Sequence, residues 1–172
     1  MKAQIIRMCK LAIVFALTSA CYSPPEAPLT VAARVGDPAA VKKLVAQGAN
    51  PNAPDGVNSW TPLQHAIHKH QIASMVALLD SGADPNAPDP HGVTPLMMAA
   101  GYGYTDMVQI LLKRGADPRL RDRDGSTALD FAITGVTDID RFTLFDCQSD
   151  TIKVLREAGA PPSKTAAKLK RC

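Results

Sequence analysis

The hydrophobic and polar positions between Asp89 and Asp122 predict a turn, a short helix, a tight turn and a second helix. Thr94 is typical of an N-cap and Pro95 of the first helical position, so the first helix is expected to begin there. A second apolar stripe begins after Asp106 and ends before Gly115, a residue that favours a helix C-terminus. The predicted buried positions are Leu96, Ala99 and Ala100 in the first helix, and Met107, Val108, Ile110, Leu111 and Leu112 in the second.

The same pattern recurs along the chain at intervals of 33 or 34 residues. The period is marked by Leu29, Leu63, Leu96 and Leu129, and Gly-Ala pairs at 48–49, 82–83, 115–116 and 159–160 mark four predicted helix ends. Two short amphipathic helices cannot bury their apolar faces alone, so copies of the unit are expected to stack. With Trp60-Thr61-Pro62-Leu63 matching Val93-Thr94-Pro95-Leu96, the chain resembles the ankyrin repeat, whose TPLHxAA and GAD motifs recur at 33 residues.

This resemblance implies an all-α repeat solenoid of four stacked ankyrin repeats, each a helix-turn-helix with a β-hairpin or loop finger. The expected domain spans 29–160, with repeats at 29–53, 54–87, 88–120 and 121–160. The second repeat has one extra residue in its hairpin tip. The fourth contains eleven inserted residues, placed within 134–149 between its two helices. The inserted segment includes Phe142 and Phe145 and is too apolar for a structureless loop, so it either covers the open end of the last repeat or contacts a partner.

The first twenty residues are predicted to be a signal peptide rather than part of the solenoid. A positively charged start precedes the apolar segment 11–17, which is too short to span a bilayer as a helix. Segment 17–21, Leu-Thr-Ser-Ala-Cys, resembles a bacterial lipobox, which implies that Cys21 is acylated and that 21–28 forms a Pro-rich tether. An ordinary secretory signal cut nearby is the alternative. Both interpretations export the protein.

The lipobox interpretation places the protein in the periplasm, and the residue after the acylated cysteine decides between membranes. In Gram-negative lipoproteins a residue other than Asp at this position implies the outer membrane, and Tyr22 fits that rule. Export also makes a disulfide between Cys147 and Cys172 a candidate, since both thiols would remain after Cys9 is removed and Cys21 acylated. The tail at 161–172 is rich in lysine, and contact with anionic headgroups is an alternative to simple solvation.

Composition excludes some classes of function. Three of the 19 Lys and Arg residues precede Cys21 and none of the 16 Asp and Glu do, so the mature chain has 16 of each, and nothing points to nucleic acid. No nucleophile, metalloprotease, P-loop or dinucleotide motif is present, so we expect no enzyme, no cofactor and no small-molecule substrate. His65, His68 and His70 could approach a metal ion, but solvated or partner-contacting roles are favoured.

Ankyrin domains bind other proteins through hairpin tips and the concave face of the first helices, and this implies a set of partner-binding positions. Trp60 is expected to project toward a partner, although packing on an adjacent tip is the alternative. Phe131 also flanks a repeat motif. The candidate set is Val57, Asn58, Trp60, His65, His68, Lys69, Pro90, His91, Val93, Met98, Tyr102, Arg123, Asp124, Ser126, Phe142 and Phe145.

The architecture therefore predicts a membrane-anchored protein-binding module. Its resemblance to small exported ankyrin lipoproteins implies an immunity protein that binds a secreted toxin, such as a phospholipase delivered by a type VI system. The alternatives are an accessory factor for a periplasmic enzyme, such as catalase with its haem supply, and a structural scaffold of the envelope.

Overall fold

The computed structural model describes residues 26–56, 58–135 and 149–161. The predicted signal peptide and Cys21, Val57, the part of the inserted segment with Phe142, Phe145 and Cys147, and the tail from 162 to Cys172 lie outside these residues. The described helices are α2 (Pro28–Val35), α3 (Pro38–Ala46), α4 (Pro62–His68), α5 (Ile72–Asp80), α6 (Pro95–Gly101), α7 (Thr105–Lys113), α8 (Ala128–Thr134) and α9 (Ser149–Glu157).

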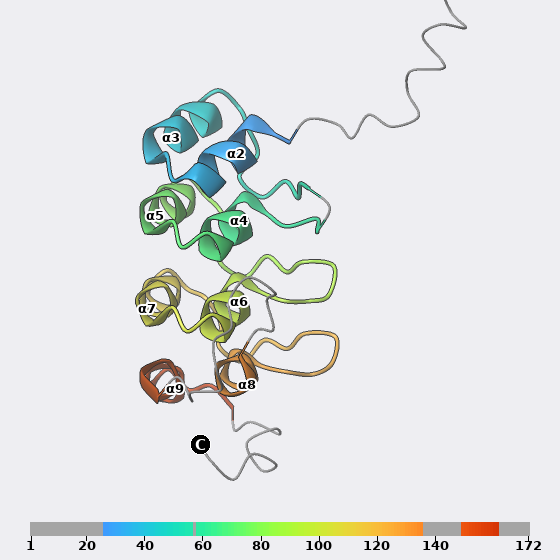
Figure 1. Cartoon of the computed structure of the whole chain (residues 1–172), viewed down its shortest axis with the longest axis vertical. Helices are drawn as coiled ribbons and strands as arrows, with labels where there is room; N and C mark the ends of the chain where they lie inside the picture. The colour runs from blue at the N-terminus through green and yellow to red at the C-terminus, as the bar shows by residue number, and fades with distance from the viewer. Residues whose placement is uncertain (1–25, 57, 136–148, 162–172) are drawn as a thin grey trace, which may run out of the picture.

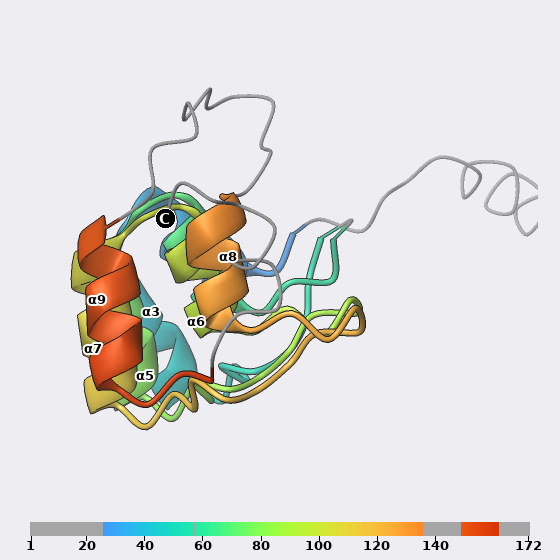
Figure 2. The same ribbon diagram turned by 90° about the horizontal axis from the view of Figure 1, so that it is seen from below.

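The helices form two parallel columns of stacked pairs (Figure 1). One column contains α2, α4, α6 and α8, which we call the inner helices, and the other contains α3, α5, α7 and α9. Neighbouring inner helices pack on each other, as do α3 on α5, α7 on α9 and the two helices of each pair. Viewed along the stack, the connections between pairs project as fingers beside the inner column (Figure 2). The described part is a four-unit helical solenoid, as the repeat pattern predicts.

Three of the described inner helices, α4, α6 and α8, begin at threonine N-caps, and Thr94 of α6 is the predicted one. In α4 the Thr61 hydroxyl accepts a hydrogen bond from the Gln64 amide at 3.3 Å, and the Gln64 side chain accepts from the Thr61 amide at 2.9 Å. Thr94 caps α6 in the same way, and the Thr127 amide donates to Asp130 at the start of α8. Reciprocal bonds of this kind satisfy amides that have no partner within the helix.

The core lies between the columns and between successive pairs. The predicted apolar positions of the central repeat are confirmed: Leu96, Ala99, Ala100, Met107, Val108 and Leu111 are buried, and Ile110 and Leu112 are partly buried against them. Gly115 has a φ of +89°, the left-handed conformation that favours glycine after a helix.

Two asparagine side chains connect successive finger bases. Asn52 donates to the carbonyl of Gly82 at 3.2 Å and accepts from the amide of Asp84 at 2.7 Å. Asn86, 34 residues later, makes the equivalent pair of bonds with the next repeat, at 3.1 and 2.8 Å. These bonds fix the spacing of adjacent fingers, because each asparagine satisfies a donor and an acceptor on its neighbour.

Some helix ends differ from the expected positions by one residue. The second helix of the central repeat begins at Thr105, before Asp106, and α2 begins at Pro28, one residue before the expected repeat start. Thr134 ends α8 and Ser149 begins α9, so the two helices meet the expected insertion range of 134–149 at its two ends. The Thr134 hydroxyl donates to the carbonyl of Asp130 at 2.9 Å, one turn earlier, which keeps Thr134 within the helix.

Candidate protein-binding surface

The structure brings aromatic and imidazole rings of the second and third repeats into one continuous row. Trp60 contacts His65 and His68, with ring centroids 5.5 and 5.2 Å apart. His68 then contacts Tyr102 at 5.7 Å, Tyr102 stacks on Tyr104 at 5.5 Å, and Tyr104 contacts His70 at 4.2 Å. We call this row the aromatic–histidine cluster; its members are Trp60, His65, His68, His70, Tyr102 and Tyr104.

The members of the cluster come from different local structures. Trp60 ends the first finger, the histidines lie on α4 and in the turn after it, and the tyrosines follow α6. Polar bonds fix two of the imidazoles: His68 Nδ1 lies 2.8 Å from the Tyr102 hydroxyl, and His70 Nε2 lies 3.6 Å from the Asp106 carboxylate. The cluster therefore joins two repeats through both ring packing and polar contacts.

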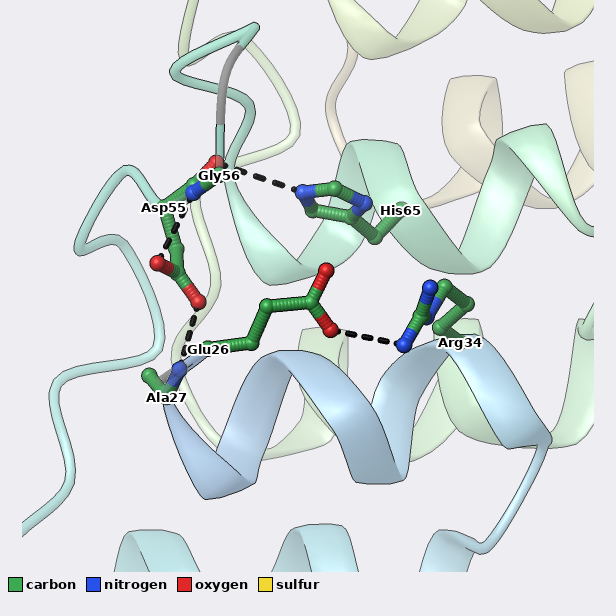
Figure 3. A network of polar contacts seen from close by, with 6 residues as sticks. All are labelled: Glu26, Ala27, Arg34, Asp55, Gly56 and His65. Atoms are coloured by element: carbon green, nitrogen blue, oxygen red, sulfur yellow. Dashed lines mark hydrogen bonds and ion pairs between the residues drawn. The ribbon is translucent and has the colours of Figure 1, made fainter. Parts of the chain in front are cut away.

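Asp55 anchors the base of the first finger to the first repeat (Figure 3). Its carboxylate accepts hydrogen bonds from the amide of Ala27, at 2.7 Å, and from the amide of Gly56, at 2.8 Å. Ala27 is the N-cap residue of α2 and has no capping side chain of its own. Asp55 thus supplies from the second repeat the cap that the first repeat lacks.

The two titratable groups at this junction have shifted pKa values. Partial burial acts to raise the pKa of Asp55, but the amides of Ala27 and Gly56 stabilise the carboxylate and hold the pKa below its ordinary value. Burial lowers the pKa of His65, although the carbonyl of Asp55, 3.3 Å from Nε2, opposes the shift. His65 is therefore neutral at pH 7 and Asp55 is charged.

The second and third fingers are closed by their own aspartates. Asp89 accepts from the amides of His91 and Val93, at 2.8 and 2.9 Å, and Asp122 makes the equivalent bonds in the third finger. The two fingers also touch: the amide of Arg123 donates to the carbonyl of His91 at 3.1 Å. Gly92 lies at this contact with a φ of +84°, and a Cβ there would lie 3.0 Å from the Arg123 nitrogen. The fingers therefore form a connected edge.

The sequence-predicted partner residues fall into three groups. Trp60, His65, His68 and Tyr102 meet in the cluster, and Lys69 is exposed beside them. The finger residues are exposed or partly exposed: Asn58, Pro90, His91, Val93, Arg123, Asp124 and Ser126. Val57, Phe142 and Phe145 lie outside the described residues.

Met98 is a correction to the predicted set. It is only 5% exposed and belongs to the core, because α6 is packed between α4 and α8. Such a side chain has no surface to offer to a partner. The prediction omitted Tyr104 and the anchoring role of Asp55. Tyr104 stands in the turn between two predicted helices, and the contact between Asp55 and Ala27 crosses 28 residues, which local pattern does not encode.

Trp60 contacts the rings of His65 and His68 in its own repeat, and its indole remains partly exposed. Within the described residues, histidines, cysteines and carboxylates form no group of three that could hold a metal ion. The described helices also include none with the length and apolar character needed to cross a membrane.

Stacked helix pairs with projecting fingers and a row of packed aromatic and imidazole rings are typical of repeat proteins that bind other molecules. The family model for ankyrin repeats matches three overlapping segments, residues 7–89, 29–122 and 73–165, which together cover most of the chain. The chain belongs to the ankyrin repeat family. Ankyrin repeats indicate a protein–protein interaction module.

Relatives from other organisms share the repeat region. The chain is 40% identical over 95 residues, 54% of its length, to neurogenic locus notch homolog protein 4 of Homo sapiens, of which it covers 5%. It is 33% identical over 92 residues, 54% of its length, to the E3 ubiquitin-protein ligase KEG of Arabidopsis thaliana, of which it covers 6%. It is 35% identical over 88 residues, 46% of its length, to ankyrin repeat family A protein 2 of Mus musculus, of which it covers 28%. The chain thus spans a small part of each relative.

Proposed function

We propose that the protein is a periplasmic immunity protein, anchored by acylated Cys21 in the outer membrane, that binds and neutralises a secreted toxin. The toxin class that fits this location is a phospholipase delivered by a type VI secretion system, because such an enzyme attacks the membrane that carries the anchor. Binding alone accounts for the activity: the bound solenoid blocks the toxin's active site or the entry of its substrate.

The observation that carries the proposal is the aromatic–histidine cluster. Tryptophan and tyrosine supply much of the binding energy at protein interfaces. Here Trp60 is partly exposed and its position is fixed by contacts with two imidazoles. A rigid aromatic side chain loses little conformational entropy when a partner covers it. Exposed Lys69 beside the cluster adds a charged group at the rim.

Membrane anchoring supports the same function. A lipid anchor confines the protein to the surface where a phospholipase acts, which raises the effective concentration of the binding site there. A toxin that reaches the bilayer then meets the binding surface within the same thin layer.

The test is copurification of the protein with the product of the neighbouring toxin gene, followed by Trp60→Ala. Truncation of an interface hot spot costs about 2–4 kcal/mol, so the Kd is expected to rise by about 30- to 1000-fold, with loss of protection in cells. Lys153→Ala is the control: it alters an exposed residue of α9, outside the candidate binding set, and is expected to change the Kd by less than about threefold. Circular dichroism of both variants confirms that the solenoid remains folded.

A combined variant tests the whole surface. If Trp60→Ala with His68→Ala and Tyr102→Ala leaves both toxin binding and protection unchanged, the proposed surface is wrong. If deletion of the gene produces sensitivity to peroxide but not to the toxin, the protein is an accessory factor instead. Mass spectrometry of the N-terminal peptide separately tests whether Cys21 is acylated.

A further inference from the structure

One end of the first repeat is exposed, whereas the equivalent side of the second repeat is covered by the first repeat. Ala77 on α5 is 2% exposed because α5 packs on α3. The equivalent residue 34 positions earlier, Lys43 on α3, is exposed. Pro62 is likewise buried, whereas its equivalent Pro28 is exposed. We call this end the N-terminal face; it consists of Pro28, Ala40, Lys43 and Leu44, whose counterparts in the second repeat are all buried.

The charge at this end is positive. Lys42 and Lys43 are adjacent and exposed on α3, and no ion pair joins either of them to another described residue. The nearby carboxylates are engaged elsewhere: Glu26 pairs with Arg34 at 2.6 Å, and Asp37 accepts from two backbone amides at the start of α3. Residues 26–53 contain three basic side chains against two carboxylates, so this part of the first repeat has a formal net charge of +1, and Lys42 and Lys43 are its exposed lysines.

The short tether places this end close to the proposed anchor. Four residues separate Cys21 from Glu26, so the five Cα–Cα steps between them reach at most about 18 Å when fully extended. The helix pair α2–α3 stands at one end of the stack and α8–α9 at the other (Figure 1). A lipid on Cys21 thus holds the first repeat near the bilayer, whereas the last repeat lies at the distant end of the stack.

We propose that the N-terminal face, with Lys42 and Lys43, rests on the anionic headgroups of the bilayer that holds the lipid anchor. This inference rests on the proposed acylation of Cys21. A basic residue near an anionic surface strengthens membrane association about fivefold, and two strengthen it about thirtyfold. Such docking leaves the aromatic–histidine cluster, which lies on the second and third repeats, open to a soluble partner.

The experiment measures the accessibility of lysines in the lipidated full-length protein. The protein is reconstituted in vesicles of phosphatidylethanolamine and phosphatidylglycerol, or of phosphatidylcholine alone, and labelled with a water-soluble amine reagent. In the anionic vesicles, we expect Lys42 and Lys43 to react at least about fivefold more slowly than in phosphatidylcholine. Lys113 and Lys153, exposed on α7 and α9, are internal controls and should react equally in both.

A single substitution tests whether the protection of the lysines from labelling is electrostatic. Lys42→Gln removes one of the two charges, so the protection of Lys43 is expected to fall by up to about fivefold. Lys113→Gln, which removes an exposed charge at the end of α7, should leave the protection of Lys43 unchanged. Both residues are exposed, so neither change is expected to disturb folding.

Four results would overturn the inference. These are equal labelling of Lys42 and Lys43 in the two vesicle types, protection of the tail lysines instead, insensitivity of Lys43 to Lys42→Gln, and an unmodified Cys21 in the mass spectrum. The first three leave toxin binding untouched and so separate this inference from the immunity function. Conversely, if Lys42 and Lys43 are protected but the protein binds no toxin, the immunity function is wrong and the proposed contact between the N-terminal face and the membrane still holds.

Discussion

Replacing Asp55 with alanine removes a cap that the second repeat supplies to the first. The Asp55 carboxylate accepts from the amides of Ala27 and Gly56, so both amides lose their partner in Asp55→Ala. The change leaves the apolar core intact, since Asp55 lies at the base of the finger rather than between helices. Its effect is therefore expected to be local and centred on α2.

The expected magnitude follows from the cost of losing a helix N-cap. Removal of a capping carboxylate costs about 0.5–2 kcal/mol, and water can partly replace the bonds here, so we expect about 1 kcal/mol. In a repeat protein the terminal unit opens separately from its neighbours. The amides of α2 should therefore exchange with solvent deuterium about fivefold faster, whereas those of α6 and α7 should keep their rates.

The pH dependence provides a second test. The pKa of Asp55 is lowered in the folded protein, so its stabilising contribution is complete above the ordinary carboxyl pKa. That contribution is lost as the pH falls through the lowered pKa. Urea unfolding should therefore show the difference between wild type and Asp55→Ala at pH 7, and the difference should shrink below about pH 4.

Asp124→Ala is the matched control, because Asp124 is an exposed aspartate of the third finger. It is expected to change the free energy of unfolding by less than about 0.5 kcal/mol. Unchanged exchange of α2 in Asp55→Ala, or a difference from wild type that persists undiminished in acid, would refute the capping role.

Three further predictions concern stability. Asn86→Ala removes two bonds to the next repeat and should lower the free energy of urea unfolding by about 1–2 kcal/mol, whereas Asn58→Ala, on an exposed finger tip, should change it by less than about 0.5 kcal/mol. Leu78→Ala should cost about 2–5 kcal/mol in the same assay because Leu78 is fully buried, with Val35→Ala, at a residue 62% exposed, as the near-neutral control. Because the pKa of His65 is lowered by burial, its protonation opposes folding: stability should decline as the pH falls below about 6.5, and His65→Gln should flatten that decline. A wild-type curve parallel to that of His65→Gln would contradict the last prediction.

The repeat architecture could be predicted from sequence because each unit contains several local signals in a fixed order. Thr94, Pro95 and Gly115 each act within a few residues of their position in the chain, and their expected helix boundaries agree with the structure to within one residue. The predicted positions in the cluster also meet, since the repeat places the end of α4, with His68, beside the end of α6, which Tyr102 follows.

Contacts between repeats were less accessible to sequence reasoning. The recurrence of an asparagine at positions 52 and 86 is visible in the sequence. The bonds that Asn52 and Asn86 make to the following repeat are seen only when the repeats are stacked. The structure also explains why no third asparagine makes these bonds in the described last repeat. Arg119 occupies the next equivalent position, and the residue that would donate to an asparagine there is Pro161, which has no amide hydrogen. An asparagine at 119 would gain one bond instead of two.

The first finger differs from the other two both in length and in what its leading aspartate binds. In the second and third fingers, the leading aspartate is occupied by amides two and four residues further along its own finger. In the longer first finger Ser59 has a φ of +51°, and Asp55 accepts from the next residue, Gly56, with one oxygen and from Ala27 of the first repeat with the other. The same finger is held on α4 through His65, against which Trp60 packs. The first finger therefore both connects the first two repeats, at an N-cap that has no capping side chain of its own, and holds Trp60 against the second inner helix.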